Sequence, residues 1–174
     1  MLHKHEGCEP CMYLDTRGNV TVGVGHLCAT SSEAARLPFV LASVKPASVE
    51  QINFGWASLR YQSKPPKLTR YTNLFLLKEN IDDLLEDDLD RFNGVMVDTF
   101  PDLNSFPMSA QTALWDMVFN LGCFGKFPKL VLAVNSKDWL TASRECLRVG
   151  ISKQRNIDTQ NLFEENAIAP DLQG

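Results

Sequence analysis

The hydrophobic period changes along the chain, and this change restricts the folds that the chain can adopt. Near the start, apolar and polar side chains alternate, so that Val20 and Val22 face one side of an extended strand. The turn-forming sequence TRGN interrupts this pattern, and we therefore expect residues 11–15 and 19–24 to pair as a β-hairpin. From Lys78 onwards the period is helical. The pattern predicts an α+β protein with a small hairpin lobe followed by a larger helical lobe.

Capping residues and apolar stripes indicate where the helices lie. We expect Ser109 and Ser136 to cap two of them, Gly122 to end the first of these two, and Pro128 to begin another. The acids between the apolar residues of the long helix are expected to form a solvated face. Helices are predicted at residues 1–9, 48–61, 79–97, 110–122, 128–135, 137–149 and 152–165.

Length and charge narrow the class of protein. The 174 residues predict a single domain, 1–174, with one lobe at about 1–75 and a second at about 76–174 around a cleft. A net charge of −4 gives no basic surface for nucleic acid, and no apolar run is long enough to span a membrane. Cys8 and Cys11 form a CxxC, the spacing of redox and metal-binding pairs. The chain has no second such pair and has three histidines, so we expect these cysteines to pack locally or to form a non-catalytic bridge. We predict no metal site and no cofactor.

The opening stretch holds more chemically active side chains than a hairpin needs. Glu6 is expected at the end of a short helix, partly buried, where burial favours a protonated carboxyl group. Asp15 is expected beside a polar turn, where it stays ionised, and Thr21 is expected across the hairpin from Asp15. Two carboxyl groups in unlike surroundings are the arrangement that glycoside hydrolysis uses. The spacing alone is also compatible with a purely structural role.

The stretch EGCEPCMYLDTRGNVTVGVGHL resembles the N-terminal signature of the phage-type lysozymes, the family-24 glycoside hydrolases. That signature reads E-G, five variable positions, Y-x-D, and then G-x-x-T-x-G-x-G-H, and it is matched here without a gap. ALWDMVFNLG at residues 113–122 resembles the central helix of the family. GISKQRNIDTQNLF at residues 150–163 is similar to a third family segment, in which Gln154 and Asp158 replace an arginine and a glutamate. The section at 29–76 is instead similar to lysozyme-like domains of larger bacterial toxins, including secreted effectors.

The resemblance implies a role for each matching residue. Glu6 would be the general acid, Asp15 would stabilise positive charge or orient the attacking water, and Thr21 would help to hold that water, in a reaction that inverts the anomeric centre. His26 and Arg155 would support the active site, Arg155 by approaching the glutamate; a hydrogen-bonded core histidine is the alternative for His26. The expected substrate-binding residues are Leu27, Phe119 and Asn120; core packing for Phe119 and a helix-end cap for Asn120 are equal alternatives.

The implied activity is that of a bacteriolytic muramidase, which cleaves the β-1,4 bond between N-acetylmuramic acid and N-acetylglucosamine in peptidoglycan. A lytic transglycosylase, a chitin-type glycosidase and a non-catalytic wall-binding module are the alternatives. The expected partner is the glycan strand, bound by a monomer, with an immunity protein or a secretion carrier as a further candidate. MLHKHEG lacks the apolar region of a signal peptide. We therefore expect a catalytic domain cut from a longer protein, which a holin, a secretion system or its parent protein delivers to the periplasm or cell wall.

Overall fold

The computed structural model describes residues 8–15, 17–61 and 70–167. Within them the chain is α+β, as the change in hydrophobic period predicted. It divides into two compact units, Met1–Asp88 and Leu89–Gly174. The sequence placed the boundary between the two lobes near residue 75. The boundary between the two units lies instead inside the helix α4 (Lys78–Thr99).

A four-stranded antiparallel sheet forms the centre of the first unit, in the order β3-β2-β1-β4. Its strands are β1 (Glu9–Leu14), β2 (Val20–Gly23), β3 (His26–Leu27) and β4 (Arg70–Tyr71). The predicted hairpin is confirmed, with Tyr13 opposite Thr21 and Leu14 opposite Val20. The predicted helix at 1–9 is wrong for Glu9, which begins β1; residues 1–7 lie outside the described part. The strand β4 was not predicted, because a strand of two residues is too short to show the alternation of apolar and polar side chains.

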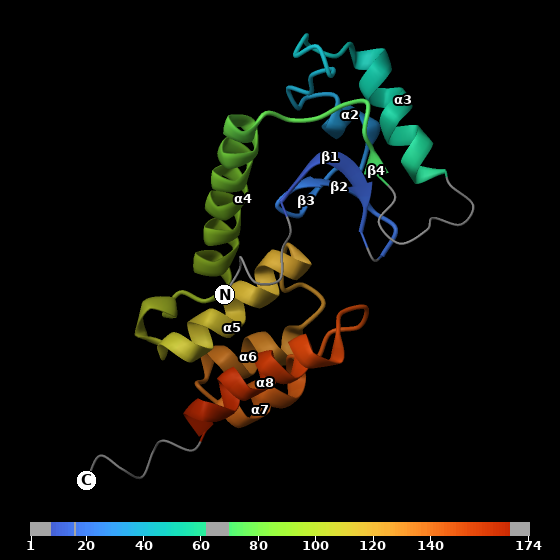
Figure 1. Cartoon of the computed structure of the whole chain (residues 1–174). Helices are drawn as coiled ribbons and strands as arrows, with labels where there is room; N and C mark the ends of the chain where they lie inside the picture. The colour runs from blue at the N-terminus through green and yellow to red at the C-terminus, as the bar shows by residue number, and fades with distance from the viewer. Residues whose placement is uncertain (1–7, 16, 62–69, 168–174) are drawn as a thin grey trace. The chain divides into compact units, whose positions relative to one another are not determined.

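Helix α3 (Val49–Arg60) lies against β1 and β4 (Figure 1). Its ends agree with the predicted helix at 48–61, since Ser48 and Gln51 form a reciprocal capping box and Tyr61 is the C-cap. Its buried residues Ile52 and Leu59 join a core that the sheet completes with Met12, Val20 and Val22. The shorter helix α2 (Ser31–Ala34) precedes it.

The second unit is helical. After the C-terminal part of α4 come η1 (Leu103–Ser105), α5 (Met108–Leu121), α6 (Pro128–Asn135), α7 (Trp139–Glu145) and α8 (Lys153–Ala167). Helix α8 packs against α5 and α7, and α7 packs against α6 (Figure 1). The fully buried side chains at the centre of this bundle include Phe100, Met117, Leu130 and Phe163.

Two helix starts differ from the prediction, and two local signals are confirmed. Ser109 does not cap α5: the helix begins at Met108, and the Ser109 hydroxyl is bonded to Asn166 of α8 at 3.1 Å. Ser136 does not cap α7 either, because Asp138 accepts from the backbone N–H of Thr141 and α7 starts at Trp139. Pro128 begins α6, and Gly122, at φ 76°, ends α5 as predicted.

Candidate active site

Asp15 organises the turn between β1 and β2. Its Oδ1 accepts from the backbone N–H groups of Arg17 and Asn19 at 2.8 and 2.7 Å, and its Oδ2 accepts from the Asn19 side-chain amide at 3.0 Å. Gly18, at φ 78°, gives the turn the left-handed residue that it needs. Both carboxylate oxygens are therefore held in place by the turn that follows the strand.

Thr21 is connected to Asp15 through Asn19. It lies on β2, on the other strand of the hairpin from Asp15, and its direct partner in the strand register is Tyr13. Its side chain is buried, and its hydroxyl donates to the Asn19 carbonyl oxygen at 3.3 Å. Asn19 thus bonds to both residues, and sequence reasoning missed it. Its position in the TRGN turn was the available signal, since asparagine side chains commonly bond within turns.

His26 is held by a carboxylate from another element. Its Nδ1 lies 2.8 Å from Oδ2 of Asp88, and the two side chains are 23% and 10% exposed. Asp88 corrects the expectation that the acids of α4 are all solvated. It recurs at helical spacing with Ile81, Leu85 and Phe92, so the apolar stripe of α4 was the signal that placed it inward.

We expect Asp88→Asn to lower the stability of the protein by about 2 kcal/mol at neutral pH. The amide keeps the shape of the carboxylate but weakens a hydrogen bond to a charged group, and such bonds contribute roughly 1.5–3 kcal/mol. Chemical denaturation measures the loss. Asp87→Asn is the matched control, because Asp87 is exposed on the same helix. Equal stability of the two variants would show that the pair contributes nothing.

Arg155 belongs to a cluster in the second unit. Its Nε and Nη2 both lie 2.9 Å from Oδ1 of Asp116 on α5. The other carboxylate oxygen of Asp116 accepts from Arg148 at 2.7 Å, and Arg148 also donates to the Thr159 hydroxyl at 2.6 Å. The Arg148 side chain is fully buried, and its Nε has no hydrogen-bond partner among the described residues. One carboxylate therefore forms ion pairs with two guanidinium groups.

The charge state of this cluster follows from its surroundings. Burial would raise the pKa of Asp116, but the hydrogen bond from Arg148 and the charges of Arg148 and Arg155 outweigh it and lower that pKa. Burial lowers the pKa of Arg148, yet a guanidinium starts so high that it remains charged. Asp116 is consequently an anion at neutral pH. Sequence reasoning missed both Asp116 and Arg148, since buried ion pairs leave no periodic pattern.

The remaining predicted site residues are distributed over both units. Leu27 is half exposed on β3. Phe119 and Asn120 are partly buried near the end of α5, and the Phe119 ring packs on Phe92 with 5.4 Å between centroids. That contact agrees with core packing for Phe119; the substrate-binding roles stay predictions. Glu6 lies outside the described residues.

The cysteines are free thiols at all five positions. Cys11 lies within β1 and Cys8 just before it, so a regular strand would separate their Cα atoms by roughly 10 Å, too far for a disulfide. The alternative of a bridge between them is therefore wrong. Among the described residues, no cluster of three or more histidine, cysteine or acidic side chains could hold a metal ion. No helix in the described ranges is both long and apolar enough to cross a membrane.

The fold, a small antiparallel sheet followed by helices, defines a lysozyme-like α+β protein. The model of the phage lysozyme family matches residues 3–161, and the chain therefore belongs to the phage lysozyme family. In a comparison with curated proteins, no sequence matches the chain. Membership of this family makes the chain a glycoside hydrolase of the lysozyme type that acts on the peptidoglycan of the cell wall.

Proposed function

We propose that the protein is a muramidase that hydrolyses the β-1,4 bond between N-acetylmuramic acid and N-acetylglucosamine, with inversion and with Glu6 as general acid. The observation that carries this proposal is the family match over residues 3–161, a range that includes Glu6, Asp15, Thr21 and Arg155. Asp15 and Thr21 also lie on one hairpin, joined by Asn19.

In the proposed reaction, the Glu6 carboxyl group donates its proton to the glycosidic oxygen as the bond to the anomeric carbon breaks. Asp15 stabilises the positive charge that develops on the sugar ring. A water molecule attacks the opposite face of the anomeric carbon and gives its proton to the Asp15 carboxylate, the acceptor that inversion requires. Both oxygens of Asp15 accept hydrogen bonds from its turn, which favours a fixed charge over a nucleophile that must form a covalent bond. This supports inversion.

Arg155 is proposed to support the active site, as the family resemblance implies. Its guanidinium group is held by Asp116, whose carboxylate also binds Arg148. In the family, the arginine at this position approaches the catalytic glutamate, and such a charge would lower the pKa of that carboxyl group and so oppose the effect of burial. We propose that His26, fixed by Asp88, supports the hairpin that carries Asp15.

The products distinguish this reaction from its alternatives. We expect the protein to clear a suspension of purified cell walls and to release muropeptides whose new reducing end is N-acetylmuramic acid. Mass spectrometry would identify a lytic transglycosylase by anhydro-sugar products that are lighter by one water. A chitin-type glycosidase would instead cleave N-acetylglucosamine oligomers faster than walls. Wall binding without any released fragment would reduce the protein to a binding module and contradict the proposal.

A further inference from the structure

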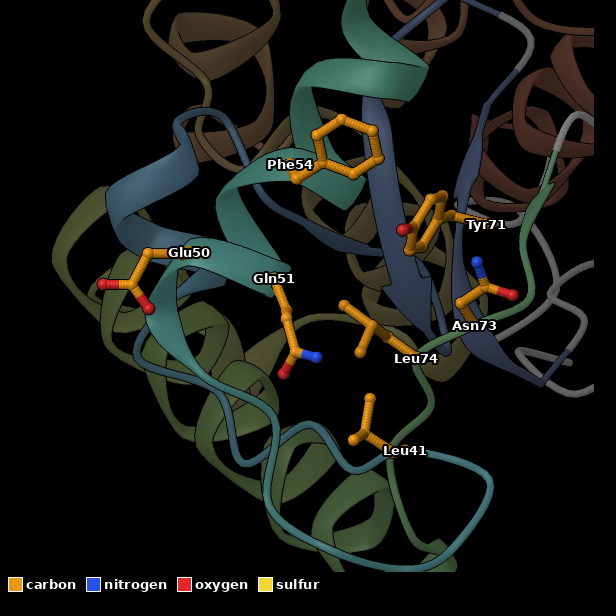
Figure 2. Close-up of a pocket in the computed structure, with 7 residues that line it drawn as sticks. All are labelled: Leu41, Glu50, Gln51, Phe54, Tyr71, Asn73 and Leu74. Atoms are coloured by element: carbon orange, nitrogen blue, oxygen red, sulfur yellow. The ribbon is translucent and has the colours of Figure 1, made fainter.

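A pocket of about 310 Å³ lies between α3 and the segment around β4, wholly within the first unit. None of its residues belongs to the proposed hydrolytic centre. They come instead from the 29–76 section, to which the sequence assigned no function. Figure 2 shows the seven lining residues: Leu41, Glu50, Gln51, Phe54, Tyr71, Asn73 and Leu74.

Two aromatic rings form the apolar wall of this pocket. Phe54 projects from α3 with 67% of its surface exposed, and its ring meets Tyr71 edge to face at 6.4 Å. Gly55 allows this arrangement, because a Cβ atom there would stand 2.8 Å from the Tyr71 ring. Leu74 is buried beside them. This apolar wall is thus part of the packing of α3 on β4. Exposure of a phenylalanine side chain to water is unfavourable, so burial of the Phe54 ring by a ligand would be favourable.

Polar groups gather around the same wall. The Gln51 side chain is oriented by its Oε1, which accepts from the Ser48 backbone N–H at 2.8 Å, so that its NH2 group remains to donate. Asn73 adds an exposed amide, and Glu50 adds a carboxylate. A hydrogen bond from Ser48 lowers the pKa of Glu50, which is therefore negative at neutral pH. The lining residues include no lysine, arginine or histidine.

We propose that this pocket is a second sugar-binding site, which takes a neutral N-acetylglucosamine residue of the wall glycan. A pyranose ring has an apolar C–H face that packs on aromatic rings, and it has hydroxyl and acetamido groups that bond to amides such as those of Gln51 and Asn73. Glu50 repels carboxylates, so the muramic acid residues with their lactyl groups and stem peptides are disfavoured. The volume is at the lower end for ligand sites, roughly 300–1,000 Å³, and suits one sugar ring.

The choice of wall glycan as ligand rests on the proposed function, but the site itself does not take part in hydrolysis. A second attachment point raises the effective concentration of an enzyme along an insoluble polymer and contributes nothing on a substrate too short to reach both sites. We therefore expect the pocket to matter for binding to intact sacculi and not for the cleavage of short soluble glycans.

The test compares Phe54→Ala and Asn73→Ala with the wild type. Both side chains are exposed, so neither change removes core packing. Tyr61→Ala is the control, since Tyr61 is an exposed aromatic residue at the end of the same helix and outside the pocket. Binding to purified sacculi is measured by co-sedimentation, and binding of N-acetylchitobiose by NMR of the Gln51 and Asn73 side-chain amides. We expect about tenfold weaker sacculus binding for Phe54→Ala, and no change for Tyr61→Ala.

The outcomes separate this inference from the proposed function. If Phe54→Ala binds sacculi as tightly as the wild type, or if N-acetylchitobiose leaves both amide signals unmoved, the second site does not exist. If an anionic muramyl fragment binds there more tightly than N-acetylchitobiose, the proposed preference is wrong. A wild type that binds through Phe54 but releases no fragments would contradict the muramidase proposal alone. Selective loss of sacculus binding, with unchanged cleavage of short soluble glycans, supports the inference.

Discussion

Replacement of Glu6 by glutamine is expected to slow cell-wall lysis by at least about a hundredfold, the lower figure for removal of a general acid. An amide has nearly the same shape as a carboxyl group but cannot supply the proton that the departing sugar oxygen needs. The melting temperature should stay within the error of the wild-type value. The initial rate of turbidity loss, measured at equal protein concentration, gives the activity.

Glu9→Gln is the matched control for this experiment. Glu9 is a second carboxylate three positions further along, and it forms a surface ion pair with Arg70 at 2.6 Å. Exposed pairs of this kind contribute little, about 0–1 kcal/mol, so the control should fold and lyse walls normally. If Glu6→Gln retained near wild-type activity, Glu6 would not be the acid. If both variants lost activity equally, the opening segment would need its charges for a reason other than catalysis.

The parts of the fold that were predicted correctly are those that local interactions determine. Helix α3 was bounded by its own caps, Ser48 and Tyr61, and α6 by its proline. The start of α5 and the strand β4 depend on partners far away in the sequence. Ser109 bonds to Asn166 of α8 instead of capping its own helix, and β4 pairs with the edge of β1. Neither partner could be identified from the residues around Ser109 or Arg70.

The same difference between local interactions and distant partners separates the site residues that were predicted from those that were missed. The sequence placed Asp15 beside its turn and Thr21 on the next strand, because both depend on the period of one hairpin. Asp88 and Asp116 were missed. Each carboxylate has a partner on another element, and a charged residue that enters a core for such a partner resembles any surface acid in the sequence.

Asp116 accepts hydrogen bonds from two guanidinium groups of the second unit. Its carboxylate bonds to the fully buried Arg148 and to Arg155, which is 14% exposed. Because the Arg148 side chain is fully buried, water cannot take the place of the Asp116 carboxylate beside it. The Nε atom of Arg148 already lacks a partner in the described structure. Removal of one member of a buried ion pair typically costs about 3–5 kcal/mol, because the other charge is left uncompensated.

Asp116→Asn is therefore expected to lower the free energy of unfolding by about 3 kcal/mol at pH 7. The lower end of the range applies because asparagine keeps a hydrogen-bonding oxygen and the site is slightly exposed. For a chain of this length, that loss corresponds to a fall in melting temperature of roughly 6–12 °C. Asp158→Asn is the control, since Asp158 is bonded to Gln154 at 2.8 Å on the surface of α8.

The stability that Asp116→Asn loses should change with pH in one direction only. Because the folded state lowers the pKa of Asp116, its ionised form stabilises the protein at every pH above the ordinary carboxyl value of 3.8. Below that value the unfolded state takes up a proton at Asp116 while the folded state does not until its own, lower pKa is reached, so the contribution of the ionised carboxylate to stability falls progressively. The difference in stability between wild type and Asp116→Asn should thus be constant from pH 7 to about pH 5 and shrink as the pH falls further. A difference that grew on acidification, or a variant as stable as Asp158→Asn at pH 7, would mean that Asp116 does not balance the charge of Arg148 and Arg155.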